Sequence, residues 1–182
     1  MRLIFWDTEL LKSVEDNGGW EGAYRGDCGL SCIALYDSAD GRFHIYDQKN
    51  LDTAVEHLNE ADLLIGFNSI KFDTVVTQAV TGRYITVQQY DLLQAIYDAI
   101  GYKVKGWKLD QVAQRTIGSG KTETGAFATQ LAADEEWGRL FTYCMHDVQL
   151  VRDLWNHLVD GLPLIAPDDT ELYLTLPMEE YA

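Results

Sequence analysis

Leu3-Ile4-Phe5-Trp6-Asp7-Thr8-Glu9 is the stretch from which the fold is inferred: an apolar run that ends in two carboxylates at i and i+2. In an extended strand this spacing places both side chains on one face, about 6–7 Å apart along the backbone. Carboxylates this close raise each other's pKa unless a positive charge lies between them. A divalent cation such as Mg²⁺ or Mn²⁺, which prefers oxygen ligands, meets that need. The alternative is a strand that frays into a polar turn, so carboxylates elsewhere in the chain decide between the two.

The length and composition of the chain indicate one ordinary globular domain. Its 182 residues suffice for a sizeable core, and 47% of them are hydrophobic and 24% charged. No run approaches the ~18 consecutive apolar residues of a membrane span, and the N-terminus lacks the pattern of a secretory signal. Cys28, Cys32 and Cys144 have no metal-finger spacing, which favours buried thiols in a reducing compartment. We therefore expect a cytoplasmic protein, or one of the host cytoplasm if its source is viral.

The chain is strongly acidic, with one basic segment. A net charge of −15 argues against a general nucleic-acid coat protein, because phosphate contacts supply most non-specific affinity. Between Gly101 and Lys121, however, five basic residues stand against one acidic residue, which gives this segment a net charge of +4. The segment either binds a phosphate backbone beside a metal-neutralised site or is a solvated helix surface. Its basic residues are Lys103, Lys105, Lys108, Arg115 and Lys121.

The pattern of the remaining chain predicts a mixed sheet flanked by helices. Residues 11–29 form a Gly-rich insertion, whose Trp20 and Tyr24 either pack locally or offer a surface on which bases stack. Further strands are expected at 30–36, 42–46 and 62–67, the first two joined as a hairpin at Asp40-Gly41. Helices are expected at 51–58, 72–80, 92–100, 108–117 and 135–159.

Two further motifs supply the additional carboxylates. The strand that ends near Phe67 opens into a polar loop, and Asp73 stands at the start of the next helix, where it can project from the end of the sheet. In the last helix, Tyr143 and Asp147 are spaced i, i+4 and share one face. Asp147 lies inside an otherwise apolar stripe, which is costly for a carboxylate unless it is paired or bound to a cation.

These motifs, in this order, resemble the DEDD family of 3′→5′ exonucleases, which have a ribonuclease H-like fold. The match is to the tyrosine subclass, DEDDy, and most closely to the proofreading domains of family B DNA polymerases. Asp7-Thr8-Glu9 resembles the first motif, Gly66-Phe67-Asn68 through Phe72-Asp73 the second, and Tyr143-x-x-x-Asp147 the third. The resemblance extends over residues 3–158. It implies an α/β, ribonuclease H-like fold and a stand-alone exonuclease that hydrolyses phosphodiester bonds at the 3′ ends of single-stranded DNA.

The resemblance also assigns roles to these residues and implies two divalent cations, Mg²⁺ or Mn²⁺, as cofactors. Asp7 would bridge the two cations, Glu9 and Asp147 would complete the site of one, and Asp73 would support the other. Two cations ~3.5–4 Å apart can activate a water and stabilise the leaving 3′ oxygen. Tyr143 would orient that water. The implied metal ligands are thus Asp7, Glu9, Asp73 and Asp147, and the catalytic set adds Tyr143.

Two other interpretations of the sequence, the histidine subclass of the family and an ATP-binding loop, do not fit the residues present. The histidine subclass would have a histidine at position 142, which is Thr142, and His146 is expected on the helix surface. Gly118-Ser119-Gly120-Lys121-Thr122 looks like a phosphate loop, but the motif requires glycine where Arg115 stands and a strand before it rather than a helix. We therefore do not expect ATP binding.

Contacts to the nucleic acid are expected from polar and basic residues near the motifs and from Leu10. Leu10 either wedges against the terminal base or packs under the following loop. The expected partners are a single-stranded 3′ end and a separate polymerase, helicase or other replication or repair protein, and no membrane. Two alternatives remain open: RNA as the substrate, and a binding module of the same fold without turnover. The expected nucleic-acid contacts are Thr8, Leu10, Asn68, Lys71, Lys105, Lys108 and Lys121.

The C-terminal segment is expected to lie outside the catalytic domain. We place the exonuclease domain at residues 1–161 and an acidic tail at 162–182, in which Leu172, Leu174 and Leu176 alternate with other residues as in a half-buried strand. The tail either packs on the domain's own surface or competes with nucleic acid for the basic segment.

Overall fold

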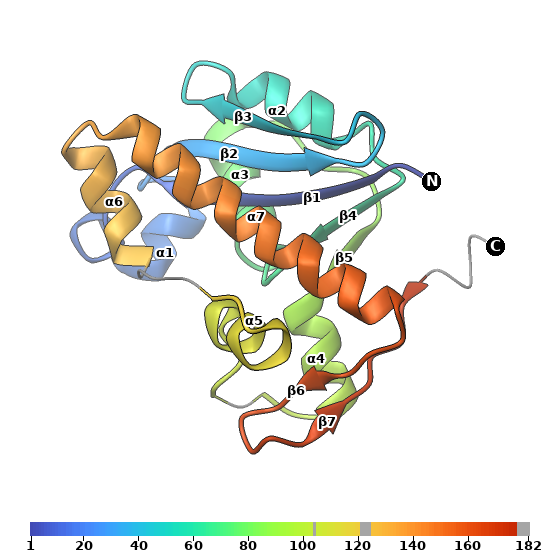
Figure 1. Cartoon of the computed structure of the whole chain (residues 1–182). Coiled ribbons are helices and arrows are strands. Elements are labelled where there is room, and N and C mark those ends of the chain that lie inside the picture. Colours follow the sequence, from blue (N-terminus) through green and yellow to red (C-terminus); the bar gives the residue numbers. More distant parts are fainter. Residues whose placement is uncertain (104, 121–124, 178–182) are drawn as a thin grey trace.

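At the centre of the computed structural model, which describes residues 1–103, 105–120 and 125–177, lies a five-stranded sheet (Figure 1). Its strands are β1 (Leu3–Leu10), β2 (Leu30–Asp37), β3 (Arg42–Asp47), β4 (Leu63–Gly66) and β5 (Gln89–Asp91). They lie in the order β3-β2-β1-β4-β5. β1 is antiparallel to β2 and parallel to β4, while β3 extends the antiparallel half and β5 the parallel half. This mixed sheet, flanked by helices, confirms the expected α/β fold.

Helices cover both faces of the sheet (Figure 1). They are α1 (Gly19–Tyr24), α2 (Leu51–Leu58), α3 (Asp73–Thr81), α4 (Leu92–Ile100), α5 (Leu109–Ile117), α6 (Gly125–Ala133) and α7 (Trp137–Val159). Buried residues of α4, α5, α6 and α7 form one hydrophobic core with one face of the sheet, and those of α1, α2 and α3 form a second core with the other face. Within the described residues, no helix combines the length and the apolar character needed to cross a membrane.

β1 contributes side chains to both cores, and this alternation decides where its carboxylates point. Phe5 lies in the core on the α7 side, and its ring meets Trp155 of α7 edge to face, with centroids 6.3 Å apart. Trp6 lies in the core on the opposite side. Because successive side chains of a strand point to opposite faces, Asp7 and Glu9 share the face of Phe5. That is the face across which α7 runs in Figure 1.

The strands and helices predicted for residues 3–159 agree with the observed ones to within about two residues at each end, whereas β5, α1, α6, the 3₁₀ turn before α1 and the short strand at Leu164–Ile165 were not predicted. The alternation expected at Leu172, Leu174 and Leu176 is a strand only at Glu171–Leu172. α1 lies in the Gly-rich insertion and follows a 3₁₀ turn, η1 (Glu15–Asn17). A Cβ on Gly22 would lie 1.8 Å from the Asn17 carbonyl oxygen. Only glycine therefore lets α1 pack against this turn.

The segment after α7 folds back against the rest of the domain. Its two short strands, β6 (Leu164–Ile165) and β7 (Glu171–Leu172), pair antiparallel, and Leu164 is only 1% exposed. Arg115 of α5 donates from Nε to the Ile165 carbonyl oxygen at 3.1 Å. Residues 162–177 thus pack on the domain's own surface, which was one of the two alternatives expected for the tail. Residues 178–182 lie outside the described part of the chain.

Candidate metal centre

The carboxylates at the end of β1 face a cysteine of α7. Asp7, Glu9 and Cys144 each offer a ligand atom, and these three atoms all lie within 4.8 Å of one another. The Cys144 Sγ is 3.7 Å from the Asp7 carbonyl oxygen and 3.9 Å from its Oδ2, within the range of weak S–H···O contacts. These residues can hold a metal ion, as the spacing of the two carboxylates predicts. Cys144 was not predicted as a member of this group.

Burial decides the state of the cysteine. Removal of Cys144 from water, together with the neighbouring Cys32 thiol, raises the pKa of Cys144 well above its usual value. At neutral pH the side chain is therefore a neutral thiol. A neutral thiol is a poor ligand for Mg²⁺ or Mn²⁺, so the oxygens of Asp7 and Glu9 are the donors that suit a hard cation here.

The third motif lies on the same helix as Cys144. Asp147 follows Cys144 by three positions on α7, which places the two side chains on one face, and Asp147 is only 1% exposed. Tyr143 is half-buried, and its ring meets Phe127 of α6 with centroids 6.3 Å apart. Asp147 is not part of the group whose ligand atoms lie within 4.8 Å of one another.

Asp73 approaches β1 from the other face of the sheet. It is the first residue of α3 and is only 3% exposed. The Thr8 backbone N–H and the Thr8 hydroxyl both donate to Asp73 Oδ1, at 3.1 and 2.7 Å. Burial raises the pKa of Asp73 to about 7, and the hydrogen bonds from Thr8 oppose this rise. Since Thr8 stands between Asp7 and Glu9 in the sequence, Asp73 is fixed to the strand that carries both.

Asp91, which the sequence reasoning did not single out, fixes the loop between β4 and Asp73. Its Oδ1 accepts from the Asn68 N–H at 2.8 Å, and its Oδ2 accepts from the Ile70 N–H at 3.2 Å. The same carboxylate caps α4 by accepting from the N–H groups of Leu93 and Gln94. Asp91 thereby ties the second motif to the parallel edge of the sheet.

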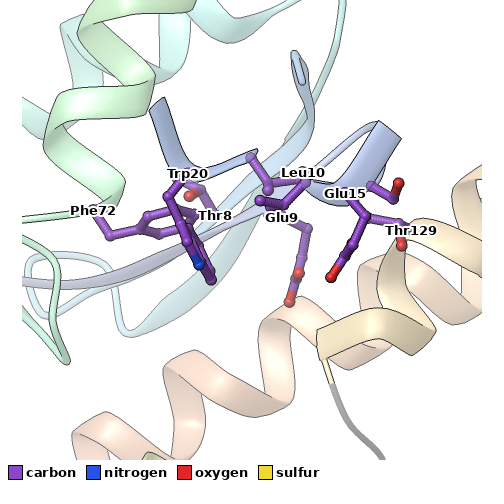
Figure 2. A pocket seen from close by; sticks show the side chains of 9 residues that line it. Thr8, Glu9, Leu10, Glu15, Trp20, Phe72 and Thr129 are labelled. Atoms are coloured by element: carbon purple, nitrogen blue, oxygen red, sulfur yellow. The ribbon is translucent and has the colours of Figure 1, made fainter. Parts of the chain in front are cut away.

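A pocket of about 510 Å³ opens beside the carboxylates. Figure 2 shows the Glu9 side chain pointing toward α7, with Glu15 of the insertion beside it and the rings of Trp20 and Phe72 farther along the wall. Leu10, which also lines this pocket, is only 8% exposed and belongs to the core on the α1 side. Glu15 was not among the expected site residues.

The expected nucleic-acid contacts occupy several places around this pocket. Thr8 and Leu10 line it, although both are largely buried. Asn68 has a positive φ of 63°. It lines two further pockets: Phe72 lines the first of them, and Lys105 and Lys108 line the second. Lys71 is exposed and donates to the Gln94 side chain of α4. Lys121 lies outside the described residues.

Comparisons with known proteins bear on the fold. No protein-family model matches the chain, and no curated protein matches it. The chain is similar in structure to the family B DNA polymerase from the hyperthermophilic archaeon Pyrobaculum calidifontis, with 20% sequence identity and a TM-score of 0.63. The match covers 87% of this chain and 24% of the polymerase, so the chain spans about a quarter of that protein's length. The chain therefore has an α/β fold that is compatible with the expected ribonuclease H-like fold.

Proposed function

We propose that the chain is a 3′→5′ exonuclease of the tyrosine DEDD subclass that depends on two divalent cations and acts on single-stranded DNA ends. The observation that carries this proposal is the attachment of all three motifs to one end of β1. Asp7 contacts Cys144, which is close to one helical turn from Asp147, and Asp73 is hydrogen-bonded to Thr8. α3 and α7 thus both pack against β1, so the elements that carry the four carboxylates meet at this strand.

The donor set suits the implied cofactor. Asp7, Glu9, Asp73 and Asp147 offer oxygen ligands, which Mg²⁺ and Mn²⁺ prefer. When bound, two such cations would activate a water and stabilise the 3′ oxygen of the preceding nucleotide, which leaves as the new 3′ end of the strand. Asp73 must release its proton to serve as a ligand, and its pKa of about 7 makes cation binding dependent on pH in the neutral range.

Tyr143, the pairing of β1 and the pocket beside Glu9 complete the proposed site. In this proposal the Tyr143 hydroxyl orients the attacking water, and α7 holds the ring beside Phe127. Asp7 and Glu9 keep their positions because this part of β1 is paired with β2, whose partners for them are Ala34 and Cys32. The pocket beside Glu9 leaves room for the terminal nucleotide.

The direct test is digestion of 5′-labelled single-stranded DNA and RNA of one sequence, each in Mg²⁺, in Mn²⁺ and in EDTA. We expect a ladder that shortens from the 3′ end of DNA, requires the cation and is abolished in Asp7→Ala. Asp160→Ala, which removes an exposed carboxylate after α7, is the matched control and should cleave normally. Faster digestion of RNA would favour the exoribonuclease alternative. Binding of either strand without any cation-dependent cleavage would favour the non-catalytic module.

A further inference from the structure

Three pockets of the described surface adjoin one another through shared lining residues, and we call this row of pockets, which begins beside the carboxylates, the track. The pocket beside Glu9 shares Trp20 and Phe72 with a pocket of about 370 Å³, which Tyr24 and Asn68 also line. Asn68 in turn belongs to a third pocket, of about 710 Å³, between α4 and the segment before α5. The track therefore runs from β1, past α1 and the β4–α3 loop, to the basic segment.

The end of the track nearest the carboxylates is aromatic. Trp20 is 62% exposed and Tyr24 is 44% exposed, and both rings meet Phe72 edge to face, with centroids 5.9 and 6.3 Å apart. Tryptophan is usually well buried, so an indole of this exposure beside a pocket marks a surface for a flat apolar ligand. Figure 2 shows the Trp20 ring hanging from α1 next to Phe72.

The far end of the track is basic. Lys105 and Lys108 line the third pocket and are exposed, and the aromatic side chains of Tyr97 and Trp107 line it with them. The chain as a whole, with a net charge of −15, repels phosphate groups, whereas these two lysines beside aromatic rings can attract them locally. Aromatic rings interleaved with cations are the combination that binds single-stranded nucleic acid without regard to sequence.

We propose that this track, defined by Trp20, Tyr24, Phe72, Asn68, Lys105 and Lys108, holds the last nucleotides of a single strand, with the 3′ end at Glu9. Trp20 stacks on a base near the 3′ end, and the 5′ part of the strand passes Lys105 and Lys108, which contact its phosphates. The assignment of the 3′ end to Glu9 rests on the proposed exonuclease function. The stacking surface does not, because α1 and the lysines form the track whether or not the carboxylates support cleavage.

The test is equilibrium binding of a short 5′-fluorescent single-stranded DNA, measured by anisotropy in the Asp7→Ala background so that the strand stays intact. Trp20→Ala should weaken binding about 5- to 150-fold, the range of one lost base–aromatic stack. Trp20→Phe, which keeps a ring, should restore most of the affinity and guards against a local folding defect. Tyr84→Ala removes an aromatic ring that is 73% exposed and lies outside the track, and it should bind as the background does.

Strands with abasic sites make the assignment specific. Removing the two bases nearest the 3′ end should weaken binding to the background protein but not further weaken binding to Trp20→Ala, because the base and the ring form one contact. Abasic sites at the 5′ end should cost the same in both proteins. The double substitution of Lys105 and Lys108 with alanine should lower the slope of log affinity against log salt by about 1.4, whereas Trp20→Ala should leave the slope unchanged.

The outcomes separate this inference from the proposed function. Equal affinity of Trp20→Ala and Tyr84→Ala, or a 3′ abasic penalty that persists in Trp20→Ala, would overturn the stacking role even if the protein is an active exonuclease. A 5′ abasic effect that depends on Trp20 would overturn the polarity. A track that behaves as predicted in a protein that cleaves nothing would leave the inference standing as a binding surface and reject the exonuclease.

Discussion

Replacing Thr8 with valine isolates one hydrogen bond that holds Asp73 against β1. The two side chains have nearly the same shape, and Thr8 is only 5% exposed, so the change removes the hydroxyl donor 2.7 Å from Asp73 Oδ1 with little effect on packing. The Thr8 backbone N–H, at 3.1 Å, remains as a donor. The predicted result depends on pH because the lost bond is stronger when Asp73 is ionised.

The magnitude follows from the pKa of about 7 that Asp73 has in the folded protein, against an ordinary value of 3.8. The folded state binds this proton more tightly, so the metal-free protein loses stability as the pH rises from about 4 to 7. Hydrogen bonds to charged groups contribute about 1.5–3 kcal/mol and those between neutral groups about 0.5–1.5 kcal/mol. Thr8→Val should therefore cost about 0.5–1.5 kcal/mol at pH 5, where Asp73 is protonated, and about 1.5–3 kcal/mol at pH 9, where it is ionised.

Urea unfolding in EDTA at the two pH values measures this difference. Thr77→Val in α3 is the matched control, since Thr77 is fully buried and its hydroxyl has no hydrogen-bond partner among the described residues. It should be neutral or stabilising by the same amount at both pH values. If Thr8→Val costs the same at pH 5 and pH 9, the reasoning about the buried, titrating Asp73 is refuted.

Three further predictions concern other parts of the domain. Tyr143→Phe should lower the rate of cleavage on the order of 10²–10⁴-fold with little change in DNA binding, and an unaltered single-turnover rate would reduce Tyr143 to a packing residue. A protein that ends at Gly161 loses the buried Leu164, so thermal unfolding should show that its free energy of unfolding falls by at least about 1.5–3 kcal/mol. Equal stability together with tighter DNA binding would instead favour a tail that competes with nucleic acid for the basic segment. Asp91→Ala removes the acceptor of four backbone N–H groups and should cost about 3 kcal/mol or more in urea unfolding, whereas an unchanged midpoint would mean that the loop is held by other contacts.

The sequence predicted the elements whose signal is local and strong. The apolar run before Asp7, the Asp40-Gly41 turn and the long stripe of α7 each carry a clear period or turn residue, and each appears as expected. β5 has three residues and is a strand only because β4 lies beside it. α6 spans nine residues without a marked apolar stripe, and α1 is a six-residue helix among glycines, so neither had a period long enough to recognise.

The candidate site divides in the same way. The carboxylates of the three motifs could be named from the sequence because their spacing within each motif is fixed, although their roles stay predictions. Cys144 could not, since its contact with Asp7 joins residues 137 positions apart. Asp91 was missed because the N–H groups of Asn68 and Ile70, which lie 23 and 21 positions away, come to it only in the folded sheet. A helix-face count from Asp147 would have placed Cys144 on the same side.

β1 and α1 differ in how firmly the rest of the molecule holds them. β1 is paired with β2 over Ile4–Leu10 and with β4 over Leu3–Phe5, so its amide protons should exchange with solvent more slowly than those of α1. α1 is six residues long and lies in the insertion that follows β1, and a helix of this length opens at a small cost in free energy. The floor of the pocket and its aromatic wall thus belong to different units of local opening. In the proposed complex, a strand end would enter by displacement of the wall while the carboxylates on β1 keep their positions.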